Sequence, residues 1–397
     1  MMHGFNLSDI TDAKLGTTTL GSIYLGSTKL WPLGTDYSKE YLTIKSLADN
    51  NTITWTFTGS DPIQNVIYWS KNGTSWTSAI ASTSDTPVSL ATLNKGEKMY
   101  LKGENVTYAS SASRYSHFNS DAEFNISGNI MSLIYGDNFI GQATLSSTYN
   151  FVGIFRSSKV YDASNLILPA TTLANYCYSN MFNGCTSLAT APVLPATTLA
   201  SSCYAYMFYG CTSLATAPVL PATKLTTSCY AYMFEGCSSL ATAPVLSATT
   251  LANSCYMSMF AGTKITAAPE LPATTLANSC YRNMFYGCAS LIYPPTLNAT
   301  ILQPRCYQHM FFGCTSLKNA PELPAKTLAT YCYAYMFQNC TSLSYIKCLA
   351  TNISASNSHD WWLYNVASTG TFVKSSSMYS WPANAHGIPS GWTVVNV

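Results

Sequence analysis

The most regular feature of the chain is a pattern of hydrophobic and polar positions that recurs about every 26 residues. Seven units follow one another from about Leu173 to Lys347, and the second complete unit, Leu199–Lys224, reads LASSCYAYMFYGCTSLATAPVLPATK. Self-similarity at a fixed period is typical of repeat architectures, in which a single unit cannot bury its own apolar side chains. Stacked units can bury them against one another, so the pattern predicts a solenoid with ladders of identical residues in its core.

The apolar positions of each unit predict two short elements. Leu199, Cys203, Tyr204, Met207 and Phe208 recur at the spacing of one stripe of a short helix. A glycine follows this stripe in most units and would end the helix, because glycine tolerates positive φ. The second half of the unit contains two prolines, which predict an extended segment with only short β-ladders.

The segments before the repeats have strand-like patterns. Residues 1–35 alternate apolar and polar positions around a Gly-Ser pair and predict a separate hairpin. Residues 36–155 also alternate with period two, so that Ile53, Trp55 and Phe57 are expected to point to one side of a strand. Many short strands separated by turn signals predict a small β-sandwich-like domain.

The C-terminal segment, residues 348–397, is aromatic and rich in turn residues, and it predicts a cap over the last open repeat. The solenoid itself is assigned to residues 156–347. The predicted fold class is therefore α+β: a solenoid of about seven 26-residue units, each a short helix plus a short extended segment, between a β-sandwich-like domain and a cap.

The cysteines follow the same repeat and change the picture of the core. The chain has 14 cysteines, a number that in a secreted protein would suggest disulfides. Here the fourth unit has Thr263 where the second cysteine is expected, which would leave Cys255 unpaired. The C-x7-C spacing without a recurring histidine is also not a zinc motif. Small, buried, reduced core residues are the preferred interpretation, with disulfides as the alternative.

Composition limits the function. Charged residues make up 9% of the chain and the formal net charge is +2, so no basic field for nucleic acid is expected. No run of about 18 apolar residues predicts a membrane-spanning helix, so no membrane insertion is expected. The first residues do not resemble a secretory signal, so synthesis and folding in a cytoplasm are expected, with later release outside a cell still open.

Catalytic chemistry has no clear signature in the chain. The five histidines are scattered, no serine nucleophile motif accompanies them, and no glycine-rich phosphate loop precedes a helix. Two acidic residues in one cleft, as glycosidases need, are not indicated by any pattern. We therefore expect no enzyme activity, no catalytic residues, no cofactor and no metal site.

The repeat residues carry a resemblance to a known family. MFYGCTSLATAPVLP is similar to the AFxxCxxLxxIxLP pattern of BspA-like leucine-rich repeats, with Met-Phe in place of Ala-Phe. This resemblance covers the seven units. It implies a leucine-rich-repeat fold and a surface protein that adheres to cells, matrix or glycans, without catalytic residues to transfer.

The layout of the whole chain resembles proteins encoded by Bacteroides and by the phages that infect them, including crAss-like phages. The resemblance rests on a short N-terminal segment and on a terminal motif like Gly391-Trp392-Thr393-Val394. It implies a virion protein attached to other virion proteins through its N-terminal region. The candidate anchor residues are Ile23, Tyr24, Leu25, Leu30 and Trp31.

Candidate partner-binding residues come from comparing the units with one another. Two residues between the fixed Tyr and Met vary, as does the residue after the fixed Phe, and variation among stacked copies marks positions that the core does not dictate. Many of these residues are aromatic, and tyrosine is a rigid amphipathic contact residue. The alternative is that tyrosine merely covers backbone on a surface with few charges. The candidates, with two tryptophans of the cap, are Tyr206, Tyr209, Tyr232, Tyr286, Phe312, Tyr335, Trp361 and Trp362.

Together these patterns favour a phage virion surface protein, a fibre or receptor-binding component that contacts a host-surface glycan or protein through the solenoid or the cap. A sugar platform of Trp361, Trp362, Trp381 and Trp392 is one form of that contact. The alternatives are a bacterial BspA-like cell-surface adhesin and a purely structural virion decoration protein. Fibres are often homotrimers, although no heptads indicate a trimer seam.

Overall fold

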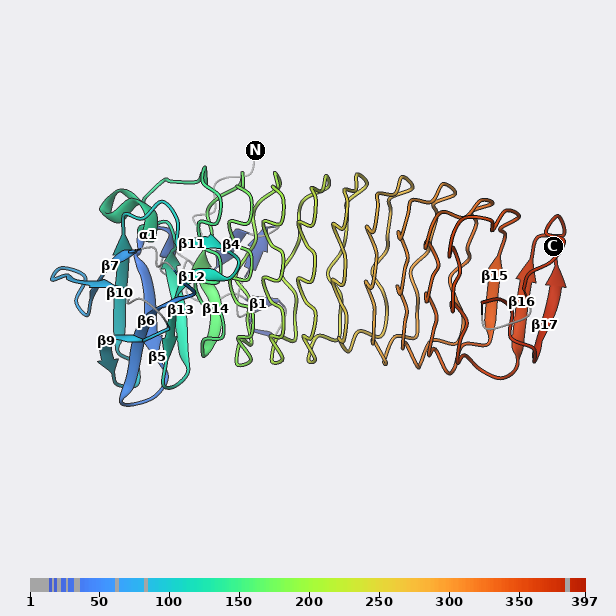
Figure 1. Ribbon diagram of the computed structural model, residues 1–397. Coiled ribbons are helices and arrows are strands. Elements are labelled where there is room, and N and C mark those ends of the chain that lie inside the picture. The colour runs from blue at the N-terminus through green and yellow to red at the C-terminus, as the bar shows by residue number, and fades with distance from the viewer. Residues whose placement is uncertain are drawn as a thin grey trace, which may run out of the picture.

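The computed structural model describes residues 36–60, 64–81, 85–382 and 386–397, together with the backbone of four short strands at 14–15, 18–19, 23–25 and 28–31. The molecule is elongated. A strand-rich part lies at one end, a row of stacked coils extends from it, and a small sheet lies at the C-terminal end (Figure 1).

Two sheets form the strand-rich part. The six-stranded sheet has the order β14 (Val160–Ile167), β13 (Phe124–Asn129), β5 (Leu42–Ser46), β10 (Lys98–Gly103), β7 (Val66–Ser70) and β8 (Thr77–Ile80). The four-stranded sheet has the order β11 (Ala109–Ser111), β12 (Arg114–Ser120), β6 (Asn51–Thr58) and β9 (Val88–Leu93). All pairs within them are antiparallel except β13 with β14, which is parallel.

The core of this part follows the predicted alternation of β6. Ile53, Trp55 and Phe57 are all 0% exposed, as the period-two pattern predicts. The Trp55 ring lies 4.4 Å from the ring of Phe118 on β12. The only helices among the described residues are α1 (Ser132–Tyr135) and the short 3₁₀ turns η2 (Tyr37–Lys39) and η3 (Gly136–Asn138).

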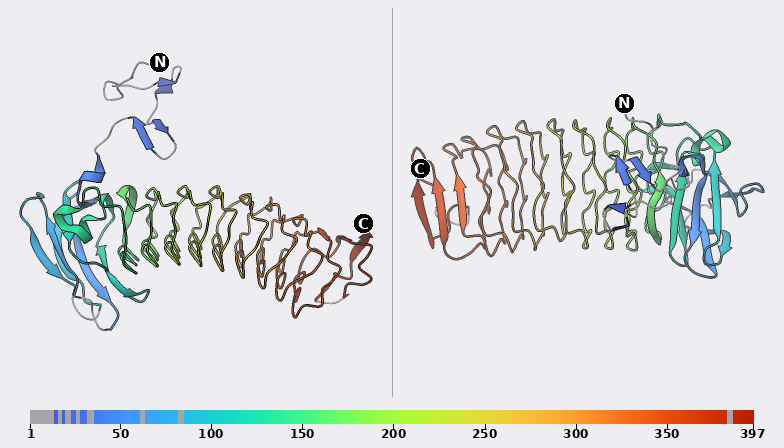
Figure 2. Two further views of the ribbon diagram at one scale, coloured as in Figure 1. Left: turned by 90° about the horizontal axis from the view of Figure 1, so that it is seen from above. Right: turned by 180° about the vertical axis from the view of Figure 1, so that it is seen from behind.

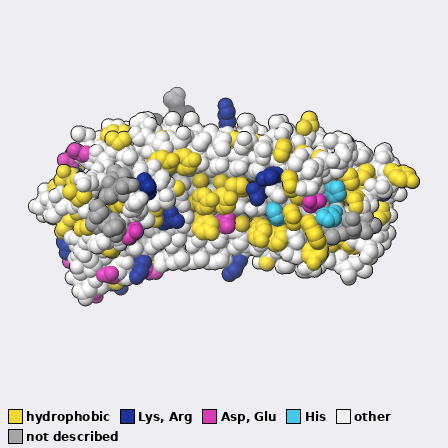
Figure 3. Space-filling model, viewed as in Figure 1, with side chains coloured by type: hydrophobic (Ala, Val, Ile, Leu, Met, Phe, Trp, Pro, Cys, Tyr) yellow, Lys and Arg dark blue, Asp and Glu magenta, His cyan; other side chains and the backbone are white. Residues whose placement is uncertain are grey.

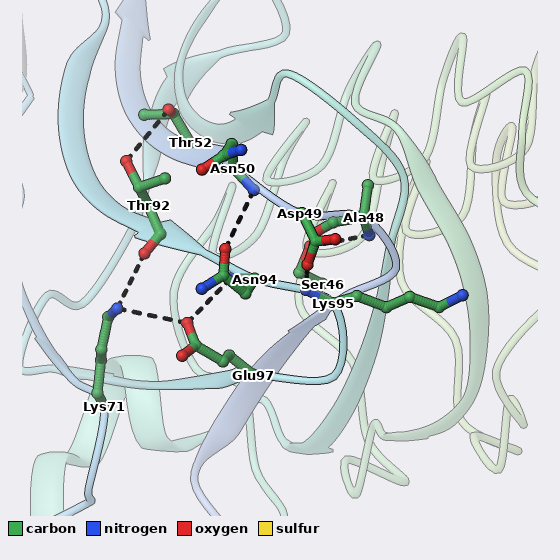
Figure 4. Close-up of polar contacts among 10 residues, drawn as sticks. All are labelled: Ser46, Ala48, Asp49, Asn50, Thr52, Lys71, Thr92, Asn94, Lys95 and Glu97. Atoms are coloured by element: carbon green, nitrogen blue, oxygen red, sulfur yellow. Dashed lines mark hydrogen bonds and ion pairs between the residues drawn. The ribbon is translucent and has the colours of Figure 1, made fainter.

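Polar contacts join the turns at one end of these sheets (Figure 4). The backbone N–H of Lys95 donates to Asp49 at 2.9 Å, and the backbone N–H of Asn94 donates to Glu97 at 2.9 Å. The Lys71 ammonium lies 3.5 Å from the Glu97 carboxylate. The acidic side chains accept hydrogen bonds from backbone N–H groups of the turns, which have no partner within the sheets. We therefore assign this cluster a structural role.

The N-terminal residues form two short hairpins. Strand β1 (Lys14–Leu15) pairs with β2 (Thr18–Thr19), and β3 (Ile23–Leu25) pairs with β4 (Thr28–Trp31), both antiparallel. The predicted hairpin is therefore confirmed at the level of the backbone. The side chains of the candidate anchor residues lie outside the described part of the chain.

The repeats do not contain the predicted short helices. Residues 149–365 are fully described, and none of them is helical. Each repeat instead forms a coil of overlapping β-turns. In the second unit Ser202, Tyr206 and Gly210 have φ of 53°, 58° and 68°, and positive φ recurs at every fourth residue in the other coils. A type II turn has a positive φ at its third residue, so every second turn of the coil has type II geometry.

The hydrogen bonds explain why a coil replaces the helix. The Tyr204 N–H donates to the Cys229 carbonyl of the next coil at 3.1 Å, whereas the Ala205 N–H donates to Ser202 of its own coil at 3.2 Å. A helix would use every N–H internally and leave nothing to join the units. A turn every four residues also places residues 0, 4 and 8 on one side, so the apolar spacing that predicted a helix fits the coil equally well.

We number coils 1 to 7 by the residue at the middle positive-φ position of each, here called the middle position: Asn180, Tyr206, Tyr232, Ser258, Asn283, His309 and Tyr335. The same φ pattern occurs once before coil 1, at Tyr149, Gly153 and Ser157, and once after coil 7, at Asn357, Trp361 and Asn365. The array is thus longer than the seven units visible in the sequence. Figure 2 shows it as a single, gently curved row.

Ladders of identical residues fill the coils, as predicted. The buried tyrosines stack face to face, with Tyr204 and Tyr230 rings 5.9 Å apart at 5°, and the phenylalanines do the same, with Phe208 and Phe234 5.7 Å apart at 3°. All 14 cysteines are buried and free, and burial raises the pKa of their thiols. The second cysteine of a unit donates to a carbonyl one coil back, as Cys237 does to Phe208 at 3.0 Å.

On the opposite side of the coils the extended segments meet only at isolated parallel bridges, such as Thr216 with Thr242 and Leu220 with Leu246. The prolines limit these ladders, as predicted. At the C-terminal end the bridges lengthen into a parallel sheet of β15 (Tyr345–Cys348), β16 (Gly370–Lys374) and β17 (Trp392–Asn396).

Candidate binding surface on the repeat array

The two variable residues between the fixed Tyr and Met of each unit have different environments. The first is buried in several coils, as Ala205, Ala231 and Ala334 show, so its variation is not a sign of a surface. The second is the middle position, where Tyr206 and Tyr232 are partly exposed. The sequence comparison treated both as surface positions, and the structure corrects this for the first.

Three residues after the middle position lies a second outward site, here called the flanking position. It is occupied in coils 1 to 7 by Asn183, Tyr209, Glu235, Ala261, Tyr286, Phe312 and Gln338. Tyr209 and Tyr286 are 37% and 41% exposed. Because coils stack in register, the middle and flanking positions form two parallel columns along one face of the array.

Aromatic residues in these columns stack into two patches. The first patch comprises Tyr206, Tyr209 and Tyr232, with Tyr206 and Tyr232 rings 4.4 Å apart at 6°.

The second patch comprises Tyr286, His309, Phe312 and Tyr335. Tyr286 stacks on Phe312 at 4.6 Å, and His309 stacks on Tyr335 at 4.7 Å. Coil 4, with Ser258 and Ala261, separates the two patches. Hydrophobic side chains gather in a band along the middle of one face of the array, with acidic, basic and histidine side chains interspersed among them (Figure 3).

Buried polar atoms accompany the aromatic patches. Among the described residues, no hydrogen-bond partner contacts Glu235 Oε2, Arg282 Nε or Gln308 Oε1, and all three atoms are buried. Burial raises the pKa of the Glu235 carboxyl. Burial and the nearby Arg282 lower the pKa of His309 to about 4, so this residue is a neutral, stacked ring.

The tryptophans of the C-terminal segment have mostly structural positions. Trp362 is 0% exposed and stacks on Tyr333 at 6.2 Å, so it continues the buried tyrosine ladder beyond coil 7. Trp381 and Trp392 are 7% and 6% exposed. The predicted four-tryptophan sugar platform and the candidate contact at Trp362 are therefore wrong, because these rings close the core. Trp361 remains on the surface as the middle residue of the coil after coil 7.

The described part of the chain contains no group of three or more His, Cys, Asp or Glu residues that could hold a metal ion. Within the same residues, no helix is long and apolar enough to span a bilayer. The coil face thus carries stacked aromatic rings together with buried polar atoms that have no partner among the described residues.

Comparison with known proteins agrees with this architecture. The BspA type leucine rich repeat region matches in six copies over residues 154–292 and 253–359, a little over half of the chain. No curated protein and no solved structure matches the chain. The matched residues contain all seven coils and both aromatic patches, and the chain belongs to the BspA-type leucine-rich-repeat family.

Proposed function

We propose that this protein is a surface-adhesion repeat protein that binds its partner through the two aromatic patches of the coil face. Its BspA-type repeats are those of a surface-adhesion or protein-binding repeat protein. The single observation that carries the proposal is the pairwise stacking of outward aromatic rings at 4.4 to 4.7 Å. Rigid stacked rings offer a large contact area at a low entropy cost, as at many protein interfaces.

The second patch provides a direct test, because the chain itself contains the replacement residue. Ala261 occupies the flanking position of coil 4, so Tyr286→Ala with Phe312→Ala should fold normally. We expect this double variant to bind the cell envelope of the host at least about tenfold more weakly, because it removes the aromatic centre of the contact. Tyr293→Ala is the matched control, since Tyr293 is 65% exposed and belongs to an extended-segment bridge rather than to the patches. Equal adhesion of both variants would contradict the proposal.

We further propose that the protein is a phage virion component attached through its N-terminal hairpins. The support is the resemblance of the segment around Ile23–Leu25 and Thr28–Trp31, and of the C-terminal motif, to virion proteins of phages that infect Bacteroides. Deletion of residues 1–35 is expected to abolish incorporation into particles, and electron microscopy of intact particles would locate the chain. Normal incorporation of the deleted chain would contradict anchoring at this segment.

Two other functions make different predictions. A bacterial cell-surface adhesin would be encoded away from capsid and tail genes and would adhere without a particle. A purely structural decoration protein would be incorporated into particles but would bind neither envelope nor glycans, and the second-patch variant would then behave like wild type in every assay.

A further inference from the structure

The first aromatic patch lies at the edge of an open hollow of about 780 Å³. One wall is the coil face, with Tyr206, Tyr232 and Glu235. The other is the tip of the β11–β12 hairpin at Ser111–Ser113, together with Arg156. Segments that are distant in sequence thus build one groove, here called the hairpin groove.

The aromatic wall of the hairpin groove ends at Tyr206, which also lies 5.8 Å from the Tyr209 ring of its own coil. Tyr206 stacks on Tyr232 on one side, while coil 1 has the smaller Asn180 at the middle position and places no second ring against Tyr206. Tyr206 and Tyr232 also have φ of 58° and 59°, a left-handed conformation that is costly for bulky residues.

Arg156 is held in place at the hairpin groove, whereas a carboxylate oxygen of Glu235 has no partner in the described part of the chain. Arg156 Nη1 donates to the Ala112 carbonyl at 3.3 Å, and its guanidinium lies 5.3 Å from the Tyr115 ring. Glu235 Oε2 is buried without a partner among the described residues. The Glu235 side chain also lines the hollow, and a carboxylate there is stabilised by a ligand that brings hydrogen-bond donors.

We propose that the hairpin groove binds an uncharged oligosaccharide, with one sugar ring packed beside Tyr206 and its hydroxyls donating to the Glu235 carboxylate. Sugars present a C–H face that packs on aromatic rings and a rim of hydroxyls that both donate and accept. Arg156 and Glu235 bring one positive and one negative charge to the groove, so a ligand without net charge suits both. The inference rests on the proposed adhesive function and names the ligand class for one of its surfaces.

The test uses the full-length protein and a panel of neutral and anionic di- to hexasaccharides, with affinities of the bound members measured by calorimetry. Wild type should bind neutral members, and Tyr206→Asn should weaken this binding at least about tenfold, since it removes the aromatic ring that the sugar contacts. Asn180 and Asn283 occupy the same position in other coils, so this variant should fold. Glu235→Gln, which keeps the shape but loses the charged acceptor, should weaken binding by about five- to tenfold. Tyr293→Ala should leave it unchanged.

The outcomes separate this inference from the proposed function. Binding of anionic members only, no saccharide binding, or equal affinity of Tyr206→Asn and Tyr293→Ala would each overturn the hairpin groove as a neutral-sugar site. If the second-patch variant still loses envelope adhesion in those cases, the adhesive function stands without a neutral-sugar site in the groove. If every variant keeps both adhesion and sugar binding, the proposed function and the neutral-sugar site are both overturned.

Discussion

At the residue scale, the middle position of each coil requires a backbone conformation that disfavours most side chains. The left-handed region costs an L-residue with a Cβ about 1–2 kcal/mol, and asparagine tolerates it best after glycine. Coils 1 and 5 have Asn180 and Asn283 there, whereas coils 2 and 6 have Tyr206 and His309. Aromatic residues at this position therefore stabilise the fold less than asparagine would, which favours a role for them at the surface.

His309→Asn tests this argument and the titration of the residue together. The pKa of His309 is about 4 in the folded protein and 6.5 for an ordinary histidine, so the wild type loses stability as pH falls from 6.5 towards 4. The variant should melt at a higher temperature than wild type at pH 7, and the difference should grow at pH 4.5. Buried His117, with its pKa also lowered to about 4, remains in both proteins and cancels in the comparison. A lower melting temperature at both pH values would contradict the argument.

Glu235→Gln should change stability in the opposite pH direction. Burial raises the pKa of this carboxyl, so its contribution to stability is fully present below the usual glutamate value of 4.5 and is lost as pH rises. Glutamine is neutral at every pH, and the variant should therefore be more stable than wild type at pH 7 and equal to it near pH 4. Melting temperatures at both pH values provide the measurement. Glu322→Gln is the control and should change little, because it removes only an exposed pair with Lys347 at 3.0 Å.

At the scale of the element, the sequence predicts the ladders but not the backbone that holds them. The recurrence of identical residues predicts the repeat period, the buried positions and the columns of stacked rings. Tyr204, Phe208 and Cys211 are all at most 1% exposed, in agreement with this prediction. The helix was a wrong prediction because apolar spacings of four, five, eight and nine fit both a helix and a coil of turns. Ser202 and Gly210 decide between the two backbones, because their φ is positive. Hydrophobic periodicity does not reveal a positive φ.

The tyrosine ladder leads to a prediction about its hydroxyl groups. The hydroxyl of Tyr204 is buried and has no hydrogen-bond partner among the described residues. Burying an unpaired hydroxyl costs about 1–3 kcal/mol, so Tyr204→Phe should keep or raise the melting temperature. Phe151 already occupies the equivalent place before coil 1, where it stacks on Tyr178 at 5.9 Å. Tyr204→Ala should lower the melting temperature strongly, since it leaves a gap in the ladder. A clear loss of stability in the phenylalanine variant would show that the hydroxyl is paired.

At the scale of the whole molecule, the candidate surface was only partly predictable. Variation among stacked copies identifies Tyr206, Tyr232 and Tyr335, because each repeat serves as a comparison for the others. The hairpin groove has no such signal, since Arg156 and the tip at Ser111–Ser113 reach the coils only through the tertiary fold. Trp362 was misassigned for the same reason: sequence shows an aromatic residue after the repeats but not that it continues a buried ladder.

The closure of the array at its C-terminal end can be tested. Trp381 stacks on Trp362 at 5.2 Å, and β16 pairs with β15 in parallel, so residues after 366 cover the last coil. In stacked repeats each unit is stabilised by its neighbours, so loss of a cap acts first on the nearest unit. Ending the chain at 366 should therefore speed amide exchange in coil 7 and the coil that follows it, while β5 and β6 exchange as in the full chain. Trp381→Ala should give a weaker change in the same coils. Faster exchange spread evenly over the molecule would mean that the array and the sheets unfold as one cooperative unit.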